Sequence, residues 1–334
     1  MHQKQTIAVL GSGSWATALV KILSDNATDK RIIWWLRNEQ TVDYIKANNH
    51  NPNYLSSVEI HPNQVEVTSD MQQAIQEADT VLLVIPSAFI FNSFQSLEKN
   101  SFVGRQVISA VKGLVPETGQ ILGEYMQEHW NCPLENIGVI TGPCHAEEVA
   151  LERLSYLTVA SENMILAESI ANCIKNRYIK CTISDDIYGT EYAAVLKNIY
   201  SIAAGICHGI GFGDNFQAVL MSNAIREIKR FINEAHPIER DINDSAYLGD
   251  LLVTGYSQFS RNRTFGNMLG KGYSVKSAQL EMNMIAEGYY AAASIYKLNQ
   301  IYKVDMPILD FTWQVIYNNK KPRLIVQEML DVLN

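Results

Sequence analysis

The first half of the chain alternates short apolar runs with amphipathic segments, and this alternation constrains the fold more than any other feature. Runs typical of strands cover residues 6–10, 31–36, 80–85, 106–110, 137–141, 156–160 and 179–183. Several are almost continuous in valine, isoleucine and leucine, as expected for strands that helices cover on both faces. Helical spacing occupies stretches between them, for example residues 15–24, 71–77 and 165–175. The sequence therefore predicts βαβ units and an α/β domain of the Rossmann type with a doubly wound sheet.

The pattern changes near Asp185. From Ile187 onward we find no run typical of a strand, and apolar side chains such as Tyr188, Tyr192 and Val195 keep helical spacing. We therefore predict a dinucleotide-binding Rossmann domain over residues 1–188 and an all-helical domain over residues 189–334 that carries the substrate and catalytic chemistry. The 334 residues suffice for two domains, each with its own core.

A glycine-rich loop follows the first predicted strand and precedes a helix. It reads Gly11-Ser12-Gly13-Ser14-Trp15-Ala16, the pattern G-x-G-x-x-A. In a dinucleotide site Gly11 allows the tight turn, Gly13 lets the pyrophosphate approach the backbone, and Ala16 permits close packing of helix on strand. The N-terminus of the helix offers N–H groups and a positive dipole end to the phosphates. An ordinary glycine turn is the alternative, but the position in the first βαβ unit favours a cofactor site.

The end of the second predicted strand bears on the choice of cofactor. An NAD site usually places a carboxylate there to bind the ribose 2′-hydroxyl. Here the strand ends in Trp35-Leu36-Arg37-Asn38, without a carboxylate, and Arg37 could bind a 2′-phosphate. The alternative is that Arg37 is a solvated residue at a strand end. We predict use of NADP, alone or alongside NAD.

A single lysine interrupts an apolar helical stretch in the second half. Between Ala193 and Ile210, Lys197 is the one residue with a formal charge when histidines are counted as neutral. A buried ammonium group without a partner is costly, so such a lysine is usually paired, shifted in pKa or functional. With a shifted pKa it is a competent general acid and base. The alternative is a lysine whose flexible stem carries the charge to the surface.

Three other segments could bring polar groups to a ligand beside Lys197. Lys112 comes just after a predicted strand end, where ligands of α/β sheets bind. Gly142 also follows a strand end, ahead of a helix whose N-terminus is a natural anion site. The third segment contains Asp250 and, further on, Ser260-Arg261-Asn262-Arg263, whose guanidinium groups suit phosphate oxygens. Each segment alone could be loop chemistry or a solvated charged face, but together they supply an acid/base, a carboxylate partner and phosphate ligands.

Taken in order, these segments resemble the bacterial type of the NAD(P)-dependent glycerol-3-phosphate dehydrogenase family, over nearly the whole chain. The landmarks are Gly11 with Gly13 to Trp15, Lys112-Gly113-Leu114, Gly142-Pro143, Ala146-Glu147, Lys197-Asn198, Ala203-Ala204-Gly205, Gly249-Asp250-Leu251, Ser260 to Arg263, Phe265-Gly266 and Glu287-Gly288. As an ordered set they are highly specific.

The resemblance implies interconversion of dihydroxyacetone phosphate and sn-glycerol 3-phosphate by direct hydride transfer with NAD or NADP, which supplies glycerol 3-phosphate for glycerophospholipid synthesis. It implies Lys197 as the proton donor and acceptor. The substrate-binding residues would be Lys112, Gly142, Cys144, Lys197, Asp250, Ser260, Arg261 and Asn262. With the loop and strand end described above, the cofactor-binding residues would be Gly11, Gly13, Ser14, Trp15, Arg37, Lys112, Ala146, Arg261, Ile285 and Glu287.

Three positions depart from the family pattern. Ala16 stands where a glycine is usual, and Gly255 stands where a cysteine is usual. Both changes are compatible with the same function. Cys144 replaces a usual serine, and a thiol is a weaker hydrogen-bond donor than a hydroxyl. The resemblance therefore places Cys144 in the substrate site by its position, but it does not imply that the thiol donates the same hydrogen bond as the usual serine.

Two other kinds of protein share part of this pattern. A β-hydroxyacid dehydrogenase or a ketopantoate reductase also combines a Rossmann loop with a lysine on a helix. The phosphate-binding cluster from Ser260 to Asn262 and the Lys112-Gly113-Leu114 segment argue against them. A non-catalytic NAD(P)-sensing protein would keep the glycine loop but would need no Lys197.

The composition of the chain limits the kinds of molecule that we expect the protein to bind. The formal net charge of -8 disfavours nucleic acid. The five cysteines are scattered and form no C-x-x-C pair, which fits free thiols in the reducing cytoplasm and gives no zinc signal. No apolar run has the length of a membrane helix, and we expect no signal peptide ahead of the first predicted strand. We expect a cytoplasmic protein with a small-molecule substrate, no metal ion and no stable membrane insertion. The oligomeric state stays open, with a homodimer as one candidate.

Overall fold

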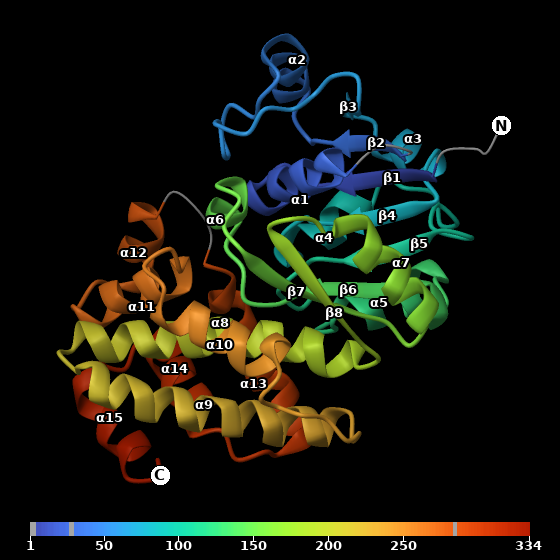
Figure 1. Cartoon of the computed structure of the whole chain (residues 1–334). Coiled ribbons are helices and arrows are strands. Elements are labelled where there is room, and N and C mark those ends of the chain that lie inside the picture. The colour runs from blue at the N-terminus through green and yellow to red at the C-terminus, as the bar shows by residue number, and fades with distance from the viewer. Residues whose placement is uncertain (1–4, 27–29, 283–285) are drawn as a thin grey trace. The chain divides into compact units, whose positions relative to one another are not determined.

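The computed structural model of the chain describes residues 5–26, 30–282 and 286–334, and the chain divides into two compact units. Unit 1 comprises residues 1–111 and 122–187, and unit 2 comprises residues 112–121 and 188–334. Figure 1 shows unit 2 mainly in yellow to red. The short segment 112–121 belongs to the helical unit although the chain on both sides of it belongs to the sheet unit.

Unit 1 is built on an eight-stranded sheet in the order β3-β2-β1-β4-β5-β6-β7-β8. The strands are β1(Gln5–Leu10), β2(Lys30–Trp35), β3(Val65–Thr68), β4(Thr80–Leu83), β5(Gln106–Ser109), β6(Ile137–Thr141), β7(Ser155–Ala160) and β8(Ile179–Ser184). Strand β1 pairs in parallel with both β2 and β4, so the strand order reverses beside it. Ligands of α/β sheets bind at such a reversal. The predicted Rossmann-type fold is confirmed.

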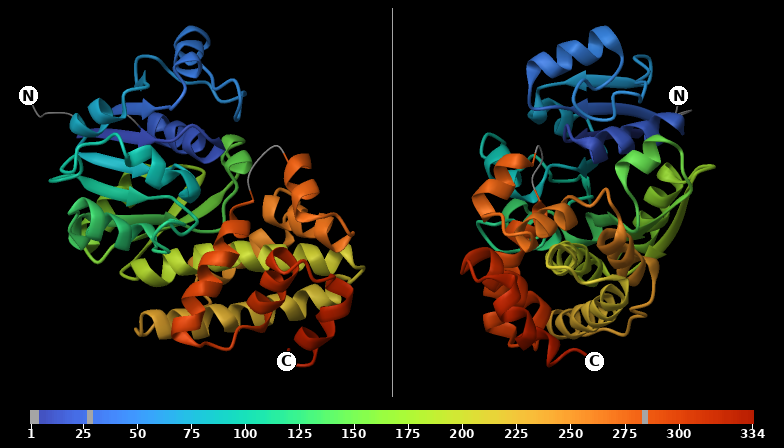
Figure 2. Two further views of the ribbon diagram at one scale, coloured as in Figure 1. Left: turned by 180° about the vertical axis from the view of Figure 1, so that it is seen from behind. Right: turned by 90° about the vertical axis from the view of Figure 1, so that its left-hand side faces the viewer.

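Helices cover both faces of this sheet (Figure 2). They are α1(Ser14–Asp25), α2(Glu39–Asn48), α3(Met71–Gln76), α4(Ser87–Phe94), α5(Leu122–Trp130), α6(Ala146–Ala150) and α7(Met164–Ile174), with a short 3-10 helix η1(Leu134–Asn136). Helices α1, α2, α6 and α7 share one apolar core with the sheet. Near α4 and α5, Phe94, Phe102 and Trp130 pack ring against ring with centroids 5.3–5.4 Å apart. Burial on both faces explains why the strands are so apolar.

Two features of the sheet differ from the predicted pattern. Strand β3 was not predicted, because its residues Val65, Glu66 and Val67 alternate between buried and exposed and form no apolar run. This strand lies at the edge of the sheet and has a neighbouring strand on one side only, so fewer of its side chains have to be apolar. Strands β6 and β7 pair antiparallel, whereas the other neighbouring pairs run parallel. Apolar content alone does not distinguish these two pairings.

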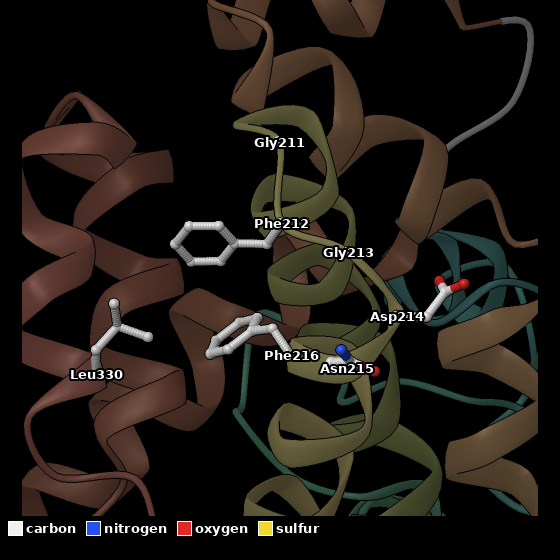
Figure 3. A pocket seen from close by; sticks show the side chains of 7 residues that line it. All are labelled: Gly211, Phe212, Gly213, Asp214, Asn215, Phe216 and Leu330. Carbon is white, nitrogen blue, oxygen red and sulfur yellow. The ribbon is translucent and has the colours of Figure 1, made fainter.

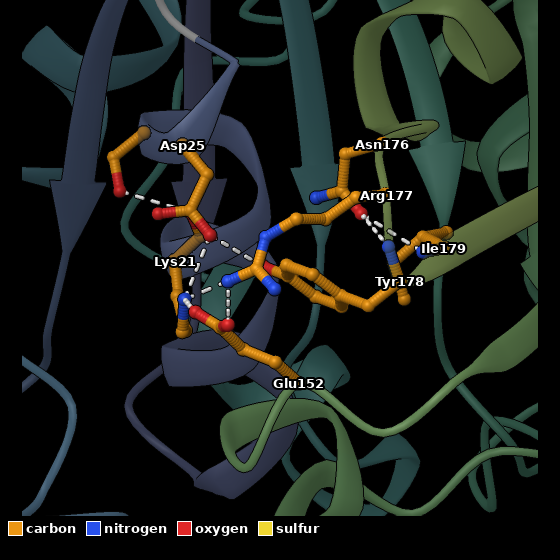
Figure 4. A network of polar contacts seen from close by, with 8 residues as sticks. Lys21, Asp25, Glu152, Asn176, Arg177, Tyr178 and Ile179 are labelled. Atoms are coloured by element: carbon orange, nitrogen blue, oxygen red, sulfur yellow. Dashed lines mark hydrogen bonds and ion pairs between the residues drawn. The ribbon is translucent and has the colours of Figure 1, made fainter.

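A network of charges ties the C-terminal end of α1 to the turns that follow α6 and α7. Lys21 Nζ lies 2.7 Å from Asp25 and 2.9 Å from Glu152, and Glu152 also pairs with Arg177. The Tyr178 hydroxyl donates to Asp25 (Figure 4). Glu152 has a left-handed backbone (φ 57°), which a non-glycine residue adopts rarely, and its two cationic partners hold its side chain in place. The network fixes α1, whose other end carries the glycine loop.

From residue 188 onward, the described part of unit 2 consists of helices joined by turns and loops. Its helices are α8(Ile187–Gly209), α9(Asp214–Ala235), α10(Asp250–Tyr256), α11(Arg261–Gly270), α12(Val275–Glu281), α13(Glu287–Tyr302), α14(Pro307–Tyr317) and α15(Pro322–Leu330), with a π-helical turn η2(Ser245–Gly249) before α10. Helix α8 runs beside α9 (Figure 2), and Tyr192 of α8 packs edge-on against Phe231 of α9. Almost every residue of α8 is buried, because the other helices surround it. The predicted all-helical second half is confirmed.

Helices α8 and α11 cross with their backbones in contact. A Cβ added at Gly205 would lie 2.1 Å from the Arg263 carbonyl oxygen, and one at Gly266 would lie 2.1 Å from the Ile202 carbonyl oxygen. Several glycines occur from Gly205 to Gly213, and glycines of this kind often end a helix and let the chain turn. Gly209 does end α8, and a φ of 105° follows at Gly211. Gly205, however, lies inside the helix and is required by the crossing.

Among the described residues, none of the helices combines the length and the apolar character needed to cross a membrane.

Candidate active site

The glycine loop of unit 1 has the geometry that a dinucleotide site requires. Gly11 has a φ of 149°, and a Cβ there would lie 2.6 Å from the Val84 carbonyl oxygen, so only glycine fits. The Gly11 carbonyl accepts a hydrogen bond of 2.7 Å from Trp34 Nε1, and the Gly11 N–H donates to the Trp35 carbonyl. Strands β2 and β4 therefore hold the loop in place.

The loop also leaves room for phosphate. A Cβ at Gly13 would meet no described atom within 4 Å, so the backbone is open to a ligand there. Gly13 is the N-cap of α1 and supplies no capping side chain, and Ser14 and Trp15 form the first turn. Asn51, which is completely buried, donates to the Ser12 carbonyl at 3.1 Å and so helps to hold the loop. The residues present fit a dinucleotide pyrophosphate.

Other predicted cofactor and substrate residues of unit 1 follow strand ends. Arg37 is exposed just beyond β2, and among the described residues its side chain makes no ion pair or hydrogen bond. Gly142 follows β6 with a φ of 124°, and a Cβ there would lie 2.8 Å from the Tyr156 carbonyl oxygen. Cys144 is buried, and Ala146 begins α6, a helix of only five residues.

In unit 2 the lysine inside the apolar helix forms an ion pair. Lys197 Nζ pairs with Asp250 Oδ1, and both residues are almost completely buried. The second oxygen, Asp250 Oδ2, is buried without a hydrogen-bond partner in the part of the chain that the structure describes. The π-helical turn η2 directly precedes Asp250, and such turns are frequent at functional sites. Lys197 is therefore not a surface lysine.

The surroundings of Lys197 lower its pKa to about 8. The main cause is burial, which disfavours the charged form, and the nearby Lys112 acts in the same direction. The Asp250 carboxylate opposes the shift. A lysine with this pKa can give or take a proton near neutral pH.

A relay of amides connects several predicted site residues of unit 2. The Asn198 side chain donates to the Lys112 carbonyl at 3.0 Å and accepts from Asn262 Nδ2 at 3.0 Å. Asn262 Oδ1 then accepts the Gly288 N–H at 2.9 Å. Asn198 thus fixes Lys112 and Asn262 relative to α8. Its neighbour Lys197 was singled out from the sequence, but Asn198 received no role, because its partners are distant along the chain.

Three cationic side chains gather around Glu287 at the start of α13. Burial raises the pKa of the Glu287 carboxyl, while Arg261, Lys112 and Lys197 act to lower it. These are the cations expected to bind substrate and cofactor, so the structure brings them together at one place in unit 2. Ile285, predicted to contact the cofactor, lies outside the described residues.

The other predicted phosphate ligand, Ser260, caps α11. Its Oγ accepts the Arg263 N–H at 3.3 Å, and Arg261 and Asn262 form the first turn of the helix. The unusual Gly255 has a structural explanation nearby. A Cβ at Gly255 would lie 2.5 Å from the Met221 sulfur, so the thioether fills the space that a cysteine would need.

A cavity of about 460 Å³ lies elsewhere in unit 2, at the turn between α8 and α9. It is lined by Gly211, Phe212, Gly213, Asp214, Asn215, Phe216 and Leu330. Figure 3 shows the two phenylalanines pointing toward Leu330 and Asp214 pointing away. The cavity contains none of the predicted site residues. Lys197 lies about 18 Å from the end of α8 at Gly209, counted along the helix axis at 1.5 Å per residue. Among the described residues, no group of histidine, cysteine and acidic side chains could hold a metal ion.

A Rossmann unit with a dinucleotide loop, together with a helical unit that buries a lysine–aspartate pair among cations, defines an NAD(P)-dependent dehydrogenase. The sequence model for the N-terminus of NAD-dependent glycerol-3-phosphate dehydrogenase matches residues 6–167, and the model for its C-terminus matches residues 186–327. The chain belongs to the NAD-dependent glycerol-3-phosphate dehydrogenase family.

Individual relatives agree with this family over nearly their full length. The chain is 36% identical over 332 residues to the glycerol-3-phosphate dehydrogenase (NAD(P)+) of Enterococcus faecalis, covering 98% of this chain and 96% of the relative. It is 34% identical over 327 residues to the enzyme of the same name from Oceanobacillus iheyensis, covering 98% and 94%. The crystal structure of the Coxiella burnetii glycerol-3-phosphate dehydrogenase is similar with a TM-score of 0.89 and 27% identity, covering 98% of this chain and 99% of that one.

Proposed function

We propose that this enzyme interconverts dihydroxyacetone phosphate and sn-glycerol 3-phosphate. It is an oxidoreductase that acts on a CH–OH group with NAD or NADP. The observation that carries the proposal is the buried pair of Lys197 and Asp250. Lys112 acts on the charge of Lys197, and Arg261, Lys112 and Lys197 all act on the carboxyl of Glu287. A ketone with a phosphate group matches an acid/base group set among cations.

The substrate itself is tested by following the absorbance of NADPH and NADH with several ketones. We expect cofactor consumption with dihydroxyacetone phosphate and little with ketopantoate or short β-keto acids. Consumption only with an unphosphorylated keto acid would show that the substrate is wrong and favour a related reductase. Binding of NADPH without turnover of any ketone would favour a sensing protein.

Lys197 is the proposed acid and base. When bound, the nicotinamide supplies or accepts a hydride at its C4. During reduction Lys197 would protonate the oxygen on substrate C2, and during oxidation it would take the proton of that hydroxyl. Asp250 Oδ1 orients the ammonium group, while Asp250 Oδ2 is available to accept a substrate hydroxyl.

The phosphate is assigned to the first turn of α11. Arg261 would bind it through its guanidinium group. The Asn262 amide donates one of its two N–H groups to Asn198, and the second N–H would donate to the phosphate. We assign Lys112, Gly142 and Cys144 to the edge of the substrate site. Binding energy from the phosphate would then position the reacting carbon.

The dinucleotide is assigned mainly to residues 1–188, and the substrate chemistry to residues 189–334. Gly11, Gly13, Ser14 and Trp15 would bind the pyrophosphate, and Ala146, Glu287 and Arg261 would contact the rest of the cofactor. The free thiols of the described cysteines agree with a reducing cytoplasm, where we place the enzyme. We propose a homodimer as its assembly and glycerophospholipid synthesis as the use of its product.

Arg37 is proposed to bind the 2′-phosphate of NADP, so its replacement should change the cofactor preference. We expect Arg37→Asp to lower the ratio of kcat/KM for NADPH over kcat/KM for NADH by about tenfold or more, since a charge-assisted contact contributes roughly 1.5–3 kcal/mol. Lys180→Asp makes the same change of charge at an exposed position of β8 and should leave the ratio unaltered. An unchanged ratio in Arg37→Asp would mean that another group binds the 2′-phosphate.

The pKa of Lys197 predicts opposite pH profiles for the two directions. Reduction needs the ammonium form, so kcat/KM for dihydroxyacetone phosphate should fall above about pH 8. The fall should approach about tenfold for each pH unit. Oxidation needs the neutral amine, so kcat/KM for glycerol 3-phosphate should rise toward pH 8 and then level. Steady-state rates from pH 6 to 10 test this, and profiles with the same sign in both directions would contradict it.

A further inference from the structure

A chain of hydroxyl contacts joins α8, α10 and α11 inside unit 2. Ser201 of α8 is completely buried, and Ser260, the N-cap of α11, is 4% exposed. Their Oγ atoms lie 2.7 Å apart. The Ser201 hydroxyl also donates to the Thr254 carbonyl at 2.9 Å, and Ser260 Oγ accepts the Arg263 N–H at 3.3 Å. The hydroxyl of a predicted phosphate ligand is therefore already engaged within the protein.

The number of protons sets the direction of these bonds. Each serine hydroxyl has one proton to donate. The Thr254 carbonyl can only accept, and it belongs to the last turn of α10, where carbonyls have no partner within the helix. The Ser201 proton satisfies this carbonyl, so the 2.7 Å contact must use the Ser260 proton. Ser260 then donates to Ser201 and accepts from Arg263.

We propose that Ser201 is a positioning residue of the phosphate site, which takes the Ser260 proton so that Ser260 acts as the cap of α11 and not as a donor to the phosphate. The inference rests on the proposed function, because it concerns how a phosphorylated ketone is bound. A phosphate competes with Ser201 for this proton. Recognition of the phosphate therefore falls mainly to Arg261 and Asn262, which the cap holds in the first turn of the helix.

The test compares kcat/KM for dihydroxyacetone phosphate with kcat/KM for dihydroxyacetone, the same ketone without phosphate. The ratio isolates phosphate recognition, because damage to the chemical step affects both substrates. In a Ser201→Ala background the Ser260 proton is free, and adding Ser260→Ala should lower the ratio by about tenfold or more. In the native background, Ser260→Ala should lower it by a clearly smaller factor. An equal or larger fall in the native background would overturn the proposal.

Ser201→Ala alone provides a second test that does not remove the cap. We expect it to raise the ratio several-fold, because a donor becomes free for the phosphate, and an unchanged or lower ratio would contradict the proposal. Ser222→Ala is the matched control, since it removes an exposed helix hydroxyl that bonds to the Ala218 carbonyl on α9. It should leave the ratio as it is.

Unfolding in urea separates failure of the hydroxyl chain from failure of the proposed substrate. A native enzyme without preference for the phosphorylated ketone would disprove the substrate. The coupling between Ser201 and Ser260 would still be measurable in the free protein. We expect the midpoint shifts of the two single variants to sum to more than the shift of the double variant. Additive shifts would overturn the hydroxyl chain.

Discussion

Replacing Lys197 by alanine is expected to lower kcat for reduction of dihydroxyacetone phosphate by about 10²–10⁴-fold, which corresponds to roughly 3–5 kcal/mol of barrier. The loss should fall mainly on kcat, because Arg261 and Asn262 still bind the phosphate. Lys197→Arg should not restore activity, since a guanidinium group keeps its proton at any working pH. Steady-state kinetics with NADPH measure both variants.

The effect of Lys197→Ala must be separated from a loss of structure, because Asp250 is left buried without its partner. Binding of NADPH, followed by its fluorescence, should persist, since the glycine loop belongs to the other unit. Lys229→Ala is the matched control, as it removes an exposed lysine from α9 in the same unit. A folded Lys197→Ala enzyme with native kcat would remove this lysine from the mechanism.

The second large effect concerns the other half of the buried pair. Asp250→Asn leaves the Lys197 charge without its counter-charge, and removal of one partner of a buried ion pair costs about 3–5 kcal/mol of unfolding free energy. Because Asp250 raises the pKa of Lys197 toward the ordinary value, its loss should lower that pKa below about 8. The reductive rate should then decline from a lower pH.

Urea unfolding and the pH profile of kcat/KM measure the two consequences of Asp250→Asn separately. Asp244→Asn makes the same change at an exposed position before η2 and should alter neither. A variant of Asp250 with native stability would mean that the ion pair contributes nothing to folding. If kcat/KM for reduction began to fall at the same pH as in the native enzyme, or at a higher pH, Asp250 would not control the Lys197 proton.

The sequence predicted the elements whose burial leaves a simple pattern. Strands buried on both faces have continuous apolar runs, and the glycine loop stands in a fixed order between a strand and a helix. Lys197 could be singled out because one charge in an apolar helix needs an explanation. The edge strand β3 was missed, because it is only four residues long and its side chains alternate between buried and more exposed positions.

The remaining features depend on partners that are remote in the sequence. Asn198 bonds to Lys112 and Asn262, and Ser201 bonds to Ser260, across separations that no local pattern reveals. The association of residues 112–121 with the helical unit is likewise a tertiary property. Sequence patterns therefore identified groups that carry charge or chemistry, whereas the neutral side chains that orient them emerged only from the structure.

The close crossing of α8 and α11 also has a consequence for substrate length. Lys197 projects from one of these helices and Arg261 from the other, and Gly205 and Gly266 let the two main chains touch. The span between the proton donor and the phosphate ligand is therefore set by peptide groups, not by side-chain volume. Substitutions that change only side-chain packing therefore leave the distance between Lys197 and Arg261 unaltered. A bulkier residue at either glycine would push the two helices apart, lengthen this distance and alter which ketone phosphate fits.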